Sequence, residues 1–190
     1  MSRWGRISRV LAGTAAAGLL LAGCGSDTGG DPSASADTAT STMLPPAPTA
    51  FDPCSSAMQP IMDSEGLSGQ NKADSDGNGG TQWRGCQWSQ PDGYSVSIRT
   101  TNITLPMIRE NADWKVAEEL EIGGRATLTY HDSEGTNAQR HCLLNLELEG
   151  GSLQFSLNNP PSRSKTGHLD TCEIAKTLAT KVVEVIPASA

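Results

Sequence analysis

The stretch RHCLLNLELEGGSLQFSLN, residues 140–158, contains two alternating apolar segments separated by a pair of glycines. Apolar side chains stand at every second position in both halves (Cys142, Leu144, Leu146 and Leu148, then Leu153, Phe155 and Leu157). A period of two residues is typical of strands with one buried face. Because Gly150-Gly151 suits a two-residue turn with positive φ, the stretch predicts an antiparallel hairpin.

A turn at Gly150-Gly151 also predicts which residues face each other. It pairs Glu149 with Ser152 and places Leu146 opposite Phe155, so that each apolar residue meets another on one face of the sheet. Residues between the apolar positions, such as Asn145, are then expected to point outward to solvent.

A helix is predicted directly after the hairpin, over residues 170–186. Asp170 is a suitable N-cap, Glu173 lies at the capping-box position, and Pro187 ends the helix. Its apolar residues form one stripe at helical spacing (Cys172, Ala175, Leu178, Ala179, Val182, Val183 and Ile186). This stripe should cover the sheet face to which Cys142 points.

The chain before this hairpin predicts a second one. Residues 82–88 and 94–101 alternate around the turn Gln90-Pro91-Asp92-Gly93, with Cys86 and Trp88 facing inward. Residues 68–81 are rich in Gly, Asn, Asp and Ser, and we expect them to form a loop.

Further short elements complete the expected fold. Helices are predicted near Pro60–Glu65 and after Thr104, and a strand is predicted over Arg125–His131, while residues 112–121 are ambiguous. The sequence therefore predicts an α+β domain: an antiparallel sheet of about five strands with the C-terminal helix packed on one face and short N-terminal helices.

The N-terminus looks like a bacterial lipoprotein signal. Arg3, Arg6 and Arg9 precede an apolar stretch too short to span a bilayer, and Leu21-Ala22-Gly23-Cys24 follows as a lipobox. We expect residues 1–23 to be removed and Cys24 to carry diacylglycerol and a further acyl chain such as palmitate, which anchors the protein to the cell membrane from outside. The short apolar stretch disfavours an uncleaved anchor, and Cys24 itself disfavours an ordinary secretory signal.

A flexible tether is expected after the signal, over residues 24–50. This segment has almost no large apolar residue and cannot bury enough surface to offset its ordering entropy. Residues 51–190 then form the folded domain. Loss of three signal arginines changes the net charge from −7 to −10, and such an acidic chain is unsuited to nucleic acid.

Four cysteines lie in the expected domain: Cys54, Cys86, Cys142 and Cys172. An even number in an exported domain indicates disulfides but leaves their connectivity open. We favour Cys54–Cys86 and Cys142–Cys172, the second because both residues face the same helix–sheet interface. Zinc is disfavoured because the sequence has no Cys-x-x-Cys motif and no Cys/His pair at ligand spacing.

The order of these features resembles the actinobacterial cell-envelope lipoproteins that carry the domain of unknown function 3558. The resemblance rests on the lipobox, the tether, Phe51-Asp52-Pro53-Cys54, Cys86-Gln87-Trp88, Gly123-Gly124-Arg125-Ala126, Cys142 in a strand, and Cys172 in a terminal helix before Pro187. It implies one α+β domain with paired cysteines on an anchored envelope protein. It implies no activity.

No motif defines an active site. Residues 74–79 fit the start of a calcium-binding EF-hand loop, but Gly85 stands where a bidentate Glu is needed, so we expect no metal. His131, His141 and His168 accompany no nucleophile motif. We therefore expect no cofactor and no catalysis. The expected function is a module that binds an envelope protein or a small apolar ligand, and the alternative is an envelope hydrolase acting on cell-wall or lipid material.

Overall fold

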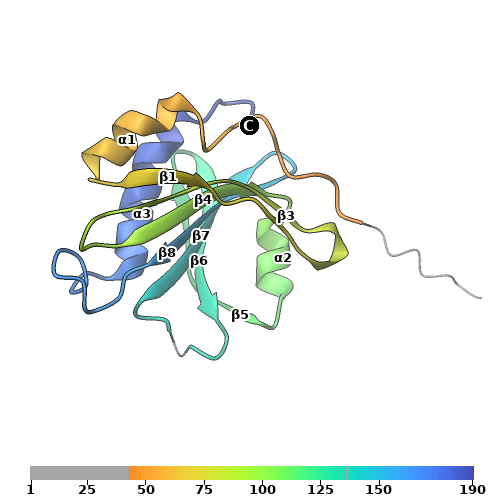
Figure 1. Ribbon diagram of the computed structural model, residues 1–190. Coiled ribbons are helices and arrows are strands. Elements are labelled where there is room, and N and C mark those ends of the chain that lie inside the picture. Colours follow the sequence, from red (N-terminus) through yellow and green to blue (C-terminus); the bar gives the residue numbers. More distant parts are fainter. Residues whose placement is uncertain (1–42, 136) are drawn as a thin grey trace, which may run out of the picture. The chain divides into compact units, whose positions relative to one another are not determined.

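Eight antiparallel strands form one sheet in the computed structural model, which describes residues 43–135 and 137–190 (Figure 1). Across the sheet the order is β1-β3-β4-β8-β7-β6-β5, and β2 pairs with β3 beside β1. The strands are β1 (Ser68–Lys72), β2 (Ser75–Asp76), β3 (Gln82–Ser89), β4 (Ser95–Thr101), β5 (Trp114–Ile122), β6 (Arg125–Asp132), β7 (His141–Leu148) and β8 (Gly151–Asn158). The predicted α+β class with an antiparallel sheet is confirmed, although the sheet has more strands than expected.

Short helical elements surround the sheet. They are the 3-10 turn η1 (Ser56–Met58), α1 (Gln59–Ser64), the 3-10 turn η2 (Asn78–Gly80), α2 (Leu105–Glu110), α3 (Thr171–Val182) and the 3-10 turn η3 (Val183–Val185). The N-cap of α3 is the predicted one, because the Asp170 carboxylate accepts hydrogen bonds from the backbone N–H groups of Cys172 and Glu173 at 2.9 and 3.0 Å. The C-terminal helix α3 packs on β7 and β8, as predicted (Figure 1).

The main core lies between the sheet and α3. Leu144, Leu146 and Phe155 of the 141–158 hairpin are completely buried there. Their neighbours in this core come from α3, from β3 and β4, and from the N-terminal helical segment (Ala175, Leu178, Ala179, Val182, Cys86, Trp88, Val96, Ile98, Met58 and Met62). Burial of this apolar area is the main stabilising contribution on this face of the sheet.

A second core lies on the opposite face, beneath α2. Leu128 and Tyr130 of β6 are completely buried against Ile108 of α2 and its neighbours Ile103 and Leu105. Leu128 and Tyr130 do share one face, as their alternation predicts, but this is the face that α3 does not cover. The expectation that β7 points Asn145 to solvent is therefore wrong, because α2 closes over this part of the sheet and Asn145 is completely buried.

A hydrogen-bonded chain of polar side chains runs through this second face. Gln154 donates to the Tyr130 hydroxyl (3.1 Å), Tyr130 donates to Asn145 (2.9 Å), and Asn145 donates to the Ser152 hydroxyl (2.7 Å). Ser152 donates in turn to the carbonyl oxygen of Ile103 (2.5 Å). Burial raises the pKa of Tyr130, so its hydroxyl stays protonated and can donate.

The hairpin register differs from the predicted one by two residues. Leu148 pairs with Gly151, and Leu146 pairs with Leu153 rather than Phe155, because the turn consists of Glu149 and Gly150. A shift of two residues keeps every side chain on its predicted face. Leu146 and Phe155 are thus both buried as expected, although they are not directly opposite each other.

The two turn glycines have different roles. Gly150 adopts a φ of 78°, which favours glycine. Gly151 lies inside β8, where a Cβ atom would be 2.1 Å from the carbonyl oxygen of Thr101. Gly150-Gly151 therefore provides one turn residue and one position of close backbone approach.

Two other segments differ from expectation. Residues 68–81, predicted as a loop, contain β1, β2 and the η2 turn, and the ambiguous residues 112–121 fall largely in β5. All five residues of β1 are exposed, so this strand lacks the alternation by which strands are recognised.

The end of the expected tether lies against the sheet. The Asn102 side-chain amide donates to the carbonyl oxygen of Pro45 (2.6 Å), and the backbone N–H of Ala47 donates to Gln82 (3.1 Å). Ala47 is buried. The packed part of the domain thus begins before residue 51. The expected signal, Cys24 and the tether up to residue 42 lie outside the described residues.

Asn145→Ala is expected to lower the free energy of unfolding by about 2–4 kcal/mol, because it removes the acceptor of the buried Tyr130 hydroxyl and the donor to the buried Ser152 hydroxyl. Glu147→Ala is the matched control. Glu147 lies two residues along the same face of β7 but is exposed, so its loss should cost less than about 0.5 kcal/mol. Urea unfolding measures both, and equally small costs would contradict the buried network.

Candidate functional site

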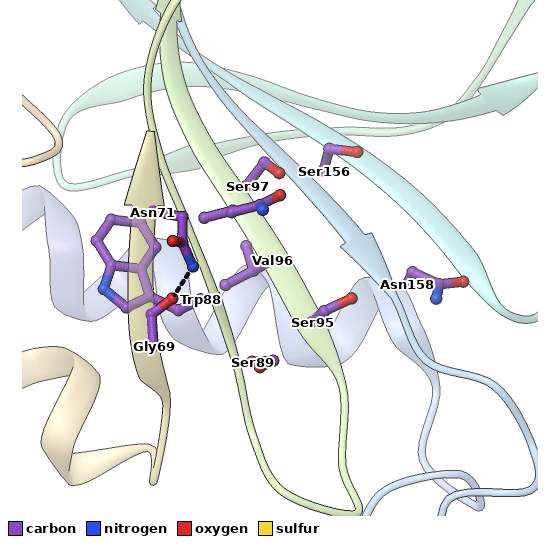
Figure 2. Close-up of a pocket in the computed structure, with 10 residues that line it drawn as sticks. Gly69, Asn71, Trp88, Ser89, Ser95, Val96, Ser97, Ser156 and Asn158 are labelled. Atoms are coloured by element: carbon purple, nitrogen blue, oxygen red, sulfur yellow. Dashed lines mark hydrogen bonds between the residues drawn. The ribbon is translucent and has the colours of Figure 1, made fainter. Parts of the chain in front are cut away.

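A polar groove crosses the sheet face opposite α3, in the part that α2 does not cover. Its volume is about 270 Å³, and it spans β1, β3, β4 and β8 (Figure 2). We call it the polar groove. The polar side chains that line it are neutral (Asn71, Gln87, Ser89, Ser95, Ser97, Ser156 and Asn158). Gly69, Trp88 and Val96 complete the lining, and no lining residue is Asp, Glu, Lys or Arg.

Strand alternation places these side chains together. In β4, Val96 and Ile98 point into the main core, so Ser95 and Ser97 point to the opposite face. In β8, Phe155 and Leu157 point to the core and leave Ser156 on the face of the groove. Ser97 pairs with Gln87 on one side and with Ser156 on the other, so polar side chains from three strands form one row.

Arg99 lies one side-chain position further along this face of β4. Its guanidinium donates to Gln154 (2.8 Å), the first residue of the buried chain, and lies 5.7 Å from the ring centre of Trp83. Burial lowers the pKa of Arg99. Among the described residues it forms no salt bridge, and its buried Nε has no hydrogen-bond partner.

A serine and a histidine meet beside the groove. The Ser156 hydroxyl lies 3.3 Å from Nε2 of His141. Burial lowers the pKa of His141. The charge of neighbouring Asp132 acts in the opposite direction, and those of His131 and Arg140 lower the pKa further. No hydrogen bond joins His141 to a carboxylate within the described part of the chain, so the pair lacks the third group that orients the base in a catalytic triad.

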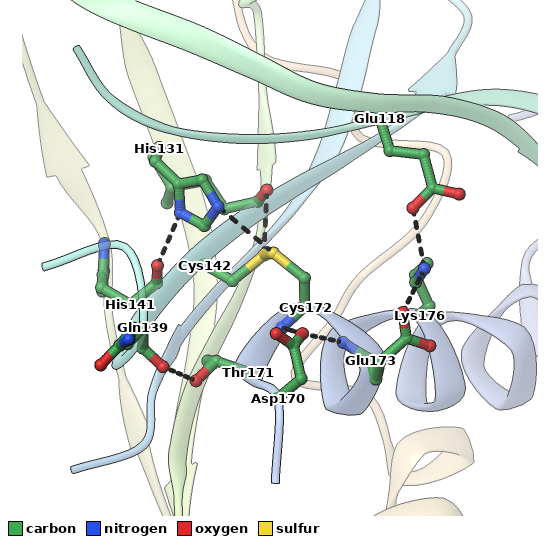
Figure 3. The surroundings of a disulfide bond; sticks show 11 residues. Glu118, His131, Gln139, His141, Cys142, Asp170, Thr171, Cys172, Glu173 and Lys176 are labelled. Carbon is green, nitrogen blue, oxygen red and sulfur yellow. Dashed lines mark hydrogen bonds and ion pairs between the residues drawn. A yellow bond between two sulfur atoms is a disulfide. The ribbon is translucent and has the colours of Figure 1, made fainter. Parts of the chain in front are cut away.

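Both disulfides join the pairs favoured above. Cys54 is bonded to Cys86, and Cys142 is bonded to Cys172. Figure 3 shows His131 beside the second disulfide: its Nε2 lies 3.8 Å from the Cys172 sulfur, and its Nδ1 lies 2.9 Å from the carbonyl oxygen of His141. Because Cys142 is completely buried, this disulfide links α3 to β7 from within the core.

The segment that resembles an EF-hand loop uses its carboxylates within the fold. Asp74 accepts a hydrogen bond from the backbone N–H of Gly85 (2.8 Å), and Asp76 pairs with Arg84 (2.5 Å). Across residues 43–135 and 137–190, no group of three or more His, Cys, Asp or Glu side chains is arranged to hold a metal ion.

A second hollow is more apolar. It has a volume of about 470 Å³ and lies between the C-terminal end of α1, the β3–β4 turn and the first turns of α3. Leu169, 45% exposed, and Ile174 line it, together with the acids Glu65 and Glu173. These two acids are paired with Lys181 and Lys176, respectively. The hollow therefore offers an apolar surface, and the charges of Glu65 and Glu173 are each balanced by a lysine.

His168 lies apart from the other two histidines. It is exposed in the loop before α3 and lines the apolar hollow rather than the polar groove. The three histidines therefore form no common site. None of the helices in the described segments is long and apolar enough to cross a membrane.

The polar groove is the feature that motif searching misses. Its residues are single Ser, Asn and Gln side chains that become neighbours only through strand pairing. One signal was available: the outward positions of residues 87–89, 95–97 and 156–158 are all neutral and polar. Outward strand positions usually include charged side chains.

The fold and the site define a disulfide-bonded α+β domain with a neutral groove on its open sheet face. The family described as "Protein of unknown function (DUF3558)" matches residues 19–185, and the chain belongs to this family. No curated protein and no solved structure matches the chain.

The pKa of His141 predicts a pH dependence of stability. Its folded-state value lies below the ordinary value of about 6.5, so the unfolded chain binds the proton more tightly. The contribution of neutral His141 to the free energy of unfolding is therefore present above about pH 6.5 and is lost as the pH falls through the folded-state pKa. Melting temperatures should fall on acidification, and His141→Gln should reduce this dependence.

His168→Gln is the control for this measurement, because His168 is exposed and lies in a different part of the domain. It should leave the pH dependence as in the wild type. An identical pH dependence in His141→Gln and the wild type would show that His141 does not contribute.

Proposed function

We propose that this chain is a membrane-anchored lipoprotein of the cell envelope whose folded domain binds a ligand or partner without catalysing a reaction. The observation that carries the proposal is the polar groove, a hollow on the sheet face with several hydrogen-bonding side chains. Ligand sites are typically concave with a few convergent polar groups. The apolar hollow beside α3 has the more apolar lining that the small apolar ligand expected from the sequence would need.

The lipobox at Leu21–Cys24 supports anchoring, and the disulfides support a location outside the cytoplasm. Two disulfides in a domain of this size are typical of proteins that fold in an oxidising compartment outside the cytoplasm. Two or three acyl chains on Cys24 hold a protein at a bilayer, since one chain alone binds only reversibly. The resemblance to actinobacterial envelope lipoproteins supports the same localisation.

Envelope hydrolysis is the second candidate, and the contact between Ser156 and His141 favours it. Two features argue against it. His141 has no hydrogen-bonded carboxylate among the described residues, and β8 pairs with strands on both sides around Ser156. Backbone N–H groups that are already paired cannot form an oxyanion hole.

Cys24→Ser tests the anchor. Mass spectrometry of the wild-type protein should find a mature N-terminus at Cys24 that carries acyl chains, and the variant should be an unmodified protein that no acyl chain holds at the membrane. An unmodified wild-type N-terminus at another residue would contradict lipidation.

Ser156→Ala tests the hydrolase alternative, with p-nitrophenyl acetate and p-nitrophenyl butyrate as substrates. We expect wild type and variant to show the same rate, no higher than that of free imidazole at equal concentration. A burst of nitrophenol in the wild type that is absent in Ser156→Ala would instead establish a Ser156 nucleophile.

A further inference from the structure

We infer that the polar groove is a binding site for a neutral carbohydrate. This inference rests on the proposed function as a binding module and adds the chemical class of its ligand. The starting observation is the absence of charge: none of the ten lining residues is ionised, whereas 18% of the whole chain is charged.

The lining offers an ionic ligand no oppositely charged group. Arg99, the next side chain on this face of β4, contacts Gln154 and Trp83 and is not part of the lining. An anionic ligand such as a phosphate or a uronic acid would bind groups of positive charge, and the lining has no Lys or Arg. A cation would need carboxylates, and the lining has none. An apolar ligand would leave the serine hydroxyls and side-chain amides without partners, which is costly.

The lining matches the chemistry of sugar hydroxyls. A serine hydroxyl both donates and accepts, and an Asn or Gln amide donates from one atom and accepts at the other. A sugar hydroxyl has the same dual capacity. Directly opposite positions such as Ser97 and Ser156 lie about 5 Å apart at Cβ, so the row can engage several hydroxyls of one ring.

The size and shape of the groove limit the ligand. Its volume of about 270 Å³ is slightly below the range of drug-sized ligands, which begins near 300 Å³, and therefore suits one or two sugar rings. The short serine side chains at the centre of the row create the hollow, and the longer Asn71 and Asn158 lie at its sides (Figure 2).

An extended peptide is the other neutral polar ligand to consider. Peptides that bind sheets usually add to a free strand edge through their backbone. The groove reaches the edge strand β1, but most of its lining lies on β3, β4 and β8, which are paired on both sides. Its hydrogen-bonding groups are side chains spread over four strands, which suits a compact ring better than an extended chain.

The test uses the full lipidated chain in lauryldimethylamine oxide, a detergent without a sugar headgroup. The probes are maltose, cellobiose and N,N′-diacetylchitobiose, observed by saturation-transfer NMR. Chitobiose is the matched charged probe, because it has the same skeleton with two ammonium groups. We expect at least one neutral disaccharide to bind with a Kd of about 10 mM or lower, and chitobiose to bind about tenfold more weakly.

Two variants locate the binding. Ser97→Leu should fill the groove and abolish the signal, and Asn158→Ala should weaken binding about twofold to tenfold through loss of its hydrogen bonds. Asn78→Ala, in the exposed η2 turn outside the groove, is the matched control and should bind as the wild type does. Melting curves verify that each variant is folded. If Ser97→Leu does not fold, weaker binding by Asn158→Ala alone shows whether the disaccharide binds in the polar groove.

Three results would overturn the inference: no binding of any neutral disaccharide at about 10 mM, binding that Asn158→Ala and Ser97→Leu leave unchanged, or preferential binding of the peptide acetyl-Gly-Ser-Gly-Ser-amide. Mass spectrometry of Cys24 and the ester assay are run on the same preparation. A lipidated, non-hydrolytic protein that binds no sugar would refute the carbohydrate ligand while leaving the proposed function intact.

Discussion

The buried chain of hydrogen bonds from Gln154 through Tyr130 and Asn145 to Ser152 is the constraint on which the rest of the structure depends. It lies on the face of β7 and β8 opposite the leucines, so this hairpin is covered on both sides. An unpartnered polar group there would cost several times the gain from one hydrogen bond. The polar chain therefore fixes the position of β6, β7 and β8 relative to one another, whereas the leucines would tolerate other arrangements.

This difference explains how far the fold could be predicted. Alternation of Leu144, Leu146 and Phe155 has a period of two, so it specifies the faces of the strands but does not distinguish registers that differ by two residues. The observed register places Asn145 directly opposite Gln154. The sequence does not show that α2 covers this face, so it gives no reason to expect Asn145 to lie opposite Gln154. Helix α3, with the Asp170 cap and a clear apolar stripe, was accessible from the sequence because both signals are local.

The polar groove was harder to predict from the sequence, for a related reason. The cysteine pairs follow from residues that each carry a strong signal, whereas Ser97, Ser156 and Asn158 carry almost none individually. Strand pairing brings them together across a distance of about sixty residues, and no local pattern records it. The exposed strand β1, which contributes Asn71, also escapes a search for alternation. What the sequence does contain is the absence of charge at these positions, which becomes informative only once the sheet order is known.

The contact between Pro45 and Asn102 has a consequence for how the domain is presented. It fixes the incoming chain at the end of the sheet where β3 begins and β4 ends, while Ser89 and Ser95 of the groove lie at the other end of this pair. The two points are separated by the length of β3, roughly 23 Å at the usual rise per residue. The chain therefore enters the packed domain at one end of this strand pair, remote from Ser89 and Ser95 at the other end, so the incoming segment leaves that end of the groove uncovered.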